Sequence, residues 1–165
     1  MKKILFICLF SVAINARLSA QNLPHFEQVK LQKRKDFKLA DSVVLQTSNY
    51  LLSIPINKDS IQRLNSAHFL MKWMDGTDDY TFTLDENSTQ YFISDINLMA
   101  VYVAALSKTA LQHKPGYDSK KITLSAIKLL LDYASNSHNN VHHTSGLDEL
   151  YDADKKGRLE SFLYP

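Results

Sequence analysis

Apolar residues recur along most of this chain at intervals of three and four positions, the spacing that places them on one face of an α-helix. The first such stretch predicts a helix over residues 36–53, which ends before Pro55 because a residue preceding a proline disfavours the helical conformation. A second helix is predicted to open at residues 57–60, where Asp59 or Ser60 can cap it, and to end at Gly76.

The second predicted helix carries apolar residues around much of its circumference. A buried stripe is expected along one row of side chains, and three further residues widen it: Ile61, Leu64, Ala67, Met71 and Met74 form the row, and Phe69, Leu70 and Trp73 extend it. A helix that is apolar on several sides has to be covered on several sides. We therefore expect this helix to lie deep among its neighbours.

Three more helices are predicted, over residues 91–113, 118–135 and 146–163, with Pro115 and Gly116 forming a turn between the first two. The run 98–106 has no charged residue, which predicts a central helix buried on nearly every side. The acidic segment 75–90 is expected to be a long loop. The pattern predicts an all-α fold, a compact single-domain bundle of about five helices with one long acidic loop. A tetratricopeptide-type array is the alternative, although no repeat of its period is found.

The first residues have the order of properties of a signal peptide. Lys2 and Lys3 are followed by an apolar run over residues 4–14, and small residues precede an expected cleavage after Ala20. The apolar run is shorter than the roughly 20 residues that span a bilayer, so no transmembrane helix is expected in the mature chain. We therefore predict a signal peptide over residues 1–20, an extended lead-in over 21–35 and a helical domain over 36–165. The protein would be exported, and periplasmic or secreted.

Cys8 is the only cysteine, and it permits one rival to this interpretation. It follows Leu5 by three positions, as in a lipoprotein signal, but bulky residues precede it and the apolar run continues beyond it. A lipoprotein is therefore the less favoured alternative. Once residues 1–20 are removed, no disulfide can form, and the core must hold the domain together unaided.

The charge of the mature chain argues against nucleic acid as a partner. The whole chain has 19 Lys and Arg against 17 Asp and Glu, and the leader holds three of the basic residues, which leaves 16 against 17. Phosphate binding requires a basic surplus. One local basic cluster stands out, and we interpret it as the solvated start of the first helix: Lys30, Lys33, Arg34, Lys35 and Lys38.

Two stretches carry a resemblance to a known family. RLNSAHFLMKWMDGTDDYTFTLDE (63–86), with WMDGT (73–77) as its most characteristic part, and SNYLLSIPIN (48–57) resemble small exported proteins from Bacteroidota that have a signal peptide, a helical body and no assigned activity. The resemblance implies an uncharacterised envelope or secreted protein and no catalytic residues. Two short sequences also resemble the O-glycosylation signal of Bacteroidota, at Ser42 and Ser60, although a helix-surface role for Ser42 and a capping role for Ser60 are the simpler explanations.

Two groups of residues could bind metal ions. His138, His142 and His143 lie in a short polar segment, and neutral imidazoles at this spacing could bind zinc. The alternative is a solvated loop. The acidic segment offers oxygen ligands for calcium, at Asp75, Asp78, Asp79, Asp85 and Glu86, but its spacing does not match an EF-hand. Helix termination and turn formation explain these acidic residues better.

Signals of catalysis are scarce. The chain has no nucleophile elbow, no phosphate-binding glycine loop and no zinc-protease helix motif. We therefore favour a non-catalytic binding or protein-interaction role, with an unknown protein or envelope component as partner and no cofactor. The alternative is a metal-dependent enzyme or hydrolase that uses the histidines of 138–143. Aromatic residues beside the acidic loop are the expected partner surface: Trp73, Tyr80 and Phe82. The competing expectation is that all three belong to the core.

Overall fold

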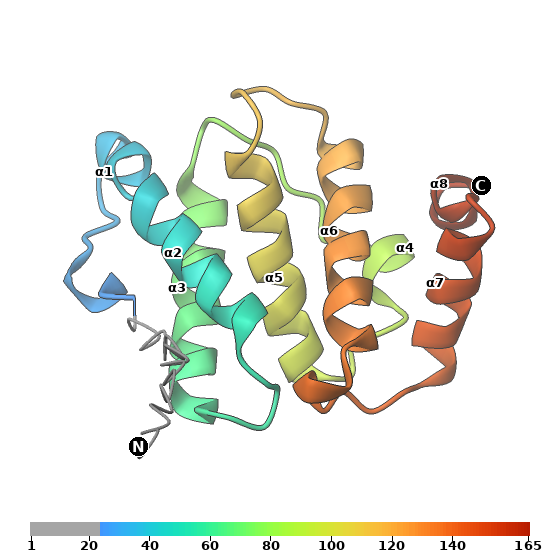
Figure 1. Cartoon of the computed structure of the whole chain (residues 1–165). Helices are drawn as coiled ribbons and strands as arrows, with labels where there is room; N and C mark the ends of the chain where they lie inside the picture. Colours follow the sequence, from blue (N-terminus) through green and yellow to red (C-terminus); the bar gives the residue numbers. More distant parts are fainter. Residues whose placement is uncertain (1–23) are drawn as a thin grey trace, which may run out of the picture.

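Helix α5 (Ile96–Leu111) lies in the middle of the molecule, as its uncharged sequence predicts. Helices α2 (Asp41–Ser53), α3 (Ser60–Gly76) and α6 (Ser119–Ser135) pack against it (Figure 1). Nearly every side chain from Leu98 to Ala110 is buried. This is a computed structural model of the whole chain that describes residues 24–165. The predicted signal peptide, its expected cleavage site and Cys8 lie outside the described residues.

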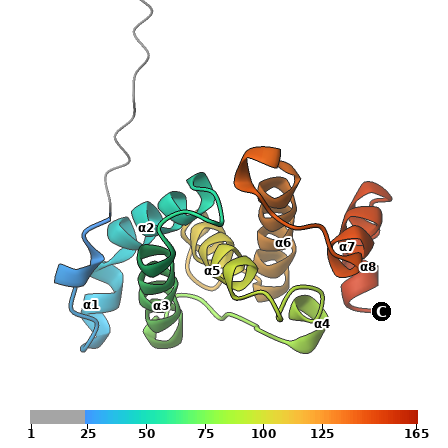
Figure 2. The ribbon, with the colours of Figure 1, turned by 90° about the horizontal axis from the view of Figure 1, so that it is seen from below.

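Shorter elements complete the fold, and the described residues contain helices and no strands. Helix α1 (Arg34–Leu39) precedes α2, α4 (Glu86–Thr89) precedes α5, and α7 (Ser145–Lys155) and α8 (Leu159–Leu163) follow α6. Single 3-10 turns lie at Phe26–Gln28 and Ser137–Asn139. Seen from below, α2 lies on one side of α5, and α4 lies on the other (Figure 2). The all-α prediction is confirmed. No helix among residues 24–165 has both the length and the apolar content needed to cross a bilayer.

Two of the five predicted helices are divided in the structure. The first begins earlier than predicted, at Arg34, where the Asp36 carboxylate accepts the backbone N–H of Lys33 at 2.9 Å, and it breaks at Ala40 into α1 and α2. The last breaks at Gly157, whose φ of +66° is the left-handed conformation that ends helices. The N–H of Arg158 then donates to the carbonyl of Ala153, which closes the end of α7.

The third predicted helix begins later than expected. It starts at Ile96 because Asp95 is its N-cap, and the Asp95 carboxylate accepts the N–H groups of Asn97 at 2.9 Å and Leu98 at 3.3 Å. Residues 91–94 form a turn instead. The short helix α4 precedes this turn, and Asp85 caps it by accepting the N–H of Ser88 at 2.8 Å. The predicted acidic loop is therefore shorter than 75–90.

A buried arginine joins the end of α2 to α3. Arg63 is 1% exposed, and its Nη1 donates to the carbonyls of Leu51 at 3.4 Å and Ile54 at 3.3 Å. The carbonyl of Ile54 also accepts the Tyr133 hydroxyl of α6 at 2.7 Å. A cation placed at the last carbonyls of a helix is favoured by the helix dipole. This contact fixes which side of α3 faces inward.

Candidate functional site

The predicted aromatic surface is mostly core. Trp73 is fully buried, Tyr80 is buried and Phe82 is half-buried. Their ring centroids lie 5.8 to 6.3 Å apart, and the Trp73 Nε1–H donates to the carbonyl of Phe37 at 3.1 Å. The Tyr80 hydroxyl donates to the carbonyl of His113 at 3.0 Å. The loop therefore packs against the helices, with Trp73 enclosed in the core and Tyr80 keeping only a small exposed fraction.

The three histidines do not assemble into a metal site. His138, His142 and His143 are all exposed. His143 stacks on Tyr151 with 6.0 Å between the ring centroids, and its Nδ1 lies 3.5 Å from a carboxylate oxygen of Asp148. Within residues 24–165 no group of three or more His, Cys, Asp or Glu side chains could hold a metal ion. The geometry therefore gives no support to the predicted zinc site.

The acidic loop faces the basic cluster rather than a cation site. Asp78 forms an ion pair with Arg34, and Asp79 binds the Lys38 ammonium at 2.8 Å. Lys38 also lies 3.1 Å from Asp41, and its hydrogen bonds to Asp79 and Asp41 raise the pKa of its ammonium group. Two ion pairs thus join α1 to the acidic loop, about 40 positions further along the sequence. The calcium prediction finds no support in this arrangement.

Helix α3 turns a different side toward the core than the sequence predicts. Ile61 is 76% exposed, Leu64 53% and Met71 49%, although all three are predicted to be buried. The opposite side of the helix is the buried one, and it carries Arg63, Ser66, Ala67, Phe69, Leu70, Trp73 and Met74. The predicted stripe combined apolar residues from both sides of the helix and did not include Arg63. Because Arg63 turns inward to the end of α2, an apolar row is left on the surface.

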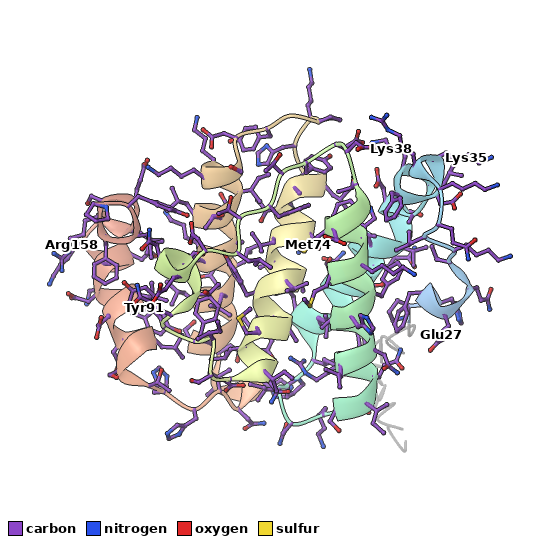
Figure 3. All side chains as sticks on the ribbon, turned by 180° about the vertical axis from the view of Figure 1, so that it is seen from behind. Glu27, Lys35, Lys38, Met74, Tyr91 and Arg158 are labelled. Carbon is purple, nitrogen blue, oxygen red and sulfur yellow. The ribbon has the colours of Figure 1, made fainter. Side chains whose placement is uncertain are left out.

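This exposed row borders a groove between α3 and α5. Leu64 and Met71 of α3 face Ile96 and Met99 of α5 across a hollow of about 370 Å³, with Ala67, Ala100 and Val103 also among its lining. Asn65 and His68 are its polar lining residues. Ile96 is 65% exposed, and Ile93, in the turn before α5, is 60% exposed. Figure 3 looks onto this face of the molecule, where α3 and α5 run side by side.

The groove continues along α3 toward the acidic loop. A second hollow of about 670 Å³ shares His68 and Met71 with the first and lies between α3 and the segment 77–84. Met74, which Figure 3 labels on this face, lines it together with Tyr80, Phe82 and Leu84. Lys72 and Asp75 supply the charges at this end. Of the predicted partner surface, Tyr80 and Phe82 line the groove, whereas Trp73 does not. We call the two hollows together the α3 groove.

Another hollow contains two carboxylates from different elements. It has a volume of about 370 Å³, lies between the turn before α5 and the start of α7, and includes Asp95 and Glu149. Asp95 is committed to capping α5, since its carboxylate accepts two backbone N–H groups. Glu149 is exposed. The pair therefore does not resemble a general acid and base held in a dry cleft.

Comparison with known proteins gives no independent guide to function: no family model, no curated protein and no solved structure matches this chain.

Proposed function

We propose that this protein is a non-catalytic binding protein of the bacterial envelope, exported by a leader over residues 1–20 to the periplasm or beyond the cell, and that the α3 groove is its contact surface. The resemblance to exported proteins of Bacteroidota and the order of residues in the leader support the location. The exposed row of aliphatic side chains along α3 is the observation that carries the binding role.

The size of the exposed apolar surface favours a partner. Four apolar side chains on or beside the groove are about half exposed or more: Leu64, Met71 and Ile96 line it, and Ile61 lies on the same side of α3 as Leu64. Full burial of such a side chain is worth about 1.5–3 kcal/mol, so leaving several together on one face forgoes a substantial stabilisation. Contiguous apolar patches on soluble proteins commonly mark interaction sites. The helix that carries this row has its other side fully engaged in the core, which holds the surface in place.

The competing hypothesis is a metal-dependent enzyme or hydrolase built on His138, His142 and His143. It has less support, because these side chains are exposed and the described residues assemble no group of metal ligands around them. Zinc therefore enters the proposal neither as a cofactor nor as a structural ion.

Photo-crosslinking in the producing cell tests the proposal. A photoreactive amino acid is placed at Leu64, Met71 or Ile96 in the groove, or at Leu39, which is 76% exposed on α1 and lies away from it. We expect a discrete adduct, with another protein or a second copy, from the groove positions and none from Leu39. Equal labelling at all four positions, or none at any, would rule the groove out as the contact surface.

A further inference from the structure

The surface around α3 has a shape that fits its own copy. The exposed side chains of Ile61, Leu64 and Met71 form a ridge along the helix, and the α3 groove runs directly beside that ridge. A ridge next to a groove is self-complementary under a twofold rotation, because the ridge of each copy enters the groove of the other. A flat patch or a closed pocket would not have this property.

We infer that a second copy of this chain covers the groove, with the two α3 helices antiparallel about a twofold axis near His68. This inference rests on the proposed role of the groove as a contact surface. It places Ile61 of each copy against the far end of the partner's groove, beyond Met71, and each Leu64 about one helical turn from the axis. Asn65 and His68, the polar groups of the groove's lining, then lie near the axis, where they can hydrogen-bond across it.

The charges along α3 agree with an antiparallel pairing. Lys58, exposed just before the helix, is the cation at one end, and Asp75, exposed in the last turn, is the anion at the other. Antiparallel packing brings each Lys58 toward the partner's Asp75, whereas parallel packing would set like charges together. Asp59, next to Lys58, accepts a hydrogen bond from the Tyr50 hydroxyl at 3.5 Å and so is engaged with α2. Antiparallel alignment of the two helix dipoles is also favourable.

Lys72 is the one exposed cation of α3, and it fits the same arrangement. Under the twofold axis it lies opposite Leu64 of the other copy. A lysine can lay its aliphatic stem on an apolar neighbour and keep its ammonium group in water, so the contact needs no buried charge.

The area of the α3 face sets the expected stability of the dimer. A helix of 17 residues is about 25 Å long, and two helices side by side are about 20 Å wide, which gives roughly 500 Å² for each copy. The total of about 1,000 Å² is at the low end of specific interfaces. We therefore expect a dimer that dissociates at micromolar concentration.

Sedimentation equilibrium over a concentration range around this value measures the association. The wild-type protein should change from monomer to dimer as its concentration rises, and Ile61→Glu should weaken the dimer at least tenfold. Leu39→Glu is the matched control, because Leu39 and Ile61 are both 76% exposed. It should leave the association unchanged, and circular dichroism should show both variants as helical as the wild type. A monomer at every concentration overturns the inference.

A cysteine placed at the axis tests the geometry. Cys8 is the only native cysteine, so His68→Cys in a Cys8→Ser background has one thiol whether or not the leader is removed. Mild oxidation should give a disulfide-linked dimer from His68→Cys and little from Asn49→Cys, an exposed control on α2. A dimer that forms but links no better through position 68 than through 49 would refute the antiparallel arrangement. A monomer whose groove still crosslinks to another protein would overturn self-association and leave the proposed binding function intact.

Discussion

Gly146, at the start of α7, lies directly against the backbone of Tyr91. A Cβ atom on Gly146 would come within 3.0 Å of both the Cα and the carbonyl carbon of Tyr91, and closer still to its carbonyl oxygen. A backbone cannot turn aside as the tip of a side chain can. The contact joins α7 to the turn before α5, two segments more than 50 positions apart in the sequence.

Gly146→Ala should destabilise the protein by about 1–3 kcal/mol, the usual cost of forcing an extra carbon into a packed contact. Alanine normally favours a helix over glycine by about 1 kcal/mol, so the intrinsic preference acts in the opposite direction. Urea unfolding followed by circular dichroism measures the change. Ser145→Ala, at the adjacent exposed position, should lie within about 0.5 kcal/mol of the wild type. Equal stability of the two variants would show that the contact has room for a methyl group.

The helices with clear end signals are the ones that could be predicted from the sequence. Pro55, Gly76 and the Pro115–Gly116 turn correctly separate the helices around them, because each makes the helical backbone unfavourable regardless of what packs nearby. Gly157 is the same kind of signal. The helical spacing of Leu159 and Leu163 is given more weight, so one unbroken helix is predicted there. The break at Ala40 had no such signal, since alanine is the best helix former.

The candidate site could not be predicted because it depends on how α3 is rotated. Apolar periodicity places a helix in the core without deciding between two apolar sides. Here a charged residue decides it: Arg63 turns inward to the carbonyls of Leu51 and Ile54, and Leu64 is therefore left outside. Sequence reasoning puts an arginine on the surface, since arginine is almost never fully buried. The tertiary contact at the end of α2 overrides that expectation.

Two substitutions of Arg63 should separate the contributions of its packing and of its charge to the free energy of unfolding. Arg63→Ala leaves a cavity and removes two hydrogen bonds to carbonyls, so we expect a loss of about 3 kcal/mol in the free energy of unfolding. Arg63→Met refills most of the space and removes the charged guanidinium. The Nε and Nη2 atoms of that guanidinium have no hydrogen-bond partner in the described part of the chain. The methionine substitution should cost less than half as much. Thermal melts of the two variants compare them, and an equal loss would show that the carbonyl contacts dominate.

The fluorescence of Trp73 should be that of an indole buried in the core. It is the only tryptophan and is fully buried, with its Nε1–H bonded to the carbonyl of Phe37. We therefore expect a blue-shifted emission that iodide quenches weakly in the native protein and strongly in urea. Phe37→Ala should leave that hydrogen bond in place, since the backbone carbonyl accepts it. Strong quenching of the native protein by iodide would mean that the indole is on the surface and would revive the predicted partner role of Trp73.

Tyr102 should make the fold sensitive to alkali. Burial at the centre of the protein raises the pKa of its phenol to about 12, and the neighbouring hydroxyls of Ser88 and Thr123 lower it only in part. An unfolded tyrosine ionises near its ordinary pKa of 10.0, so above that pH the unfolded state gains a charge that the folded state resists. The contribution of this residue is therefore fully present below pH 10 and is lost as the pH rises from about 10 to about 12, by about 3 kcal/mol in all.

Urea midpoints measured across this pH range, for wild type and for Tyr102→Phe, isolate the effect. The phenylalanine variant cannot ionise at this position, so its stability should fall less steeply above pH 10. Other buried phenols, such as that of Tyr133, also have a raised pKa and will keep part of the slope. Tyr117→Phe is the control and should follow the wild-type slope: Tyr117 is half-buried, and its ring stacks on that of His113 with 3.8 Å between the centroids. If Tyr102→Phe and wild type lost stability in parallel, the Tyr102 phenol would have to be hydrated in the folded protein.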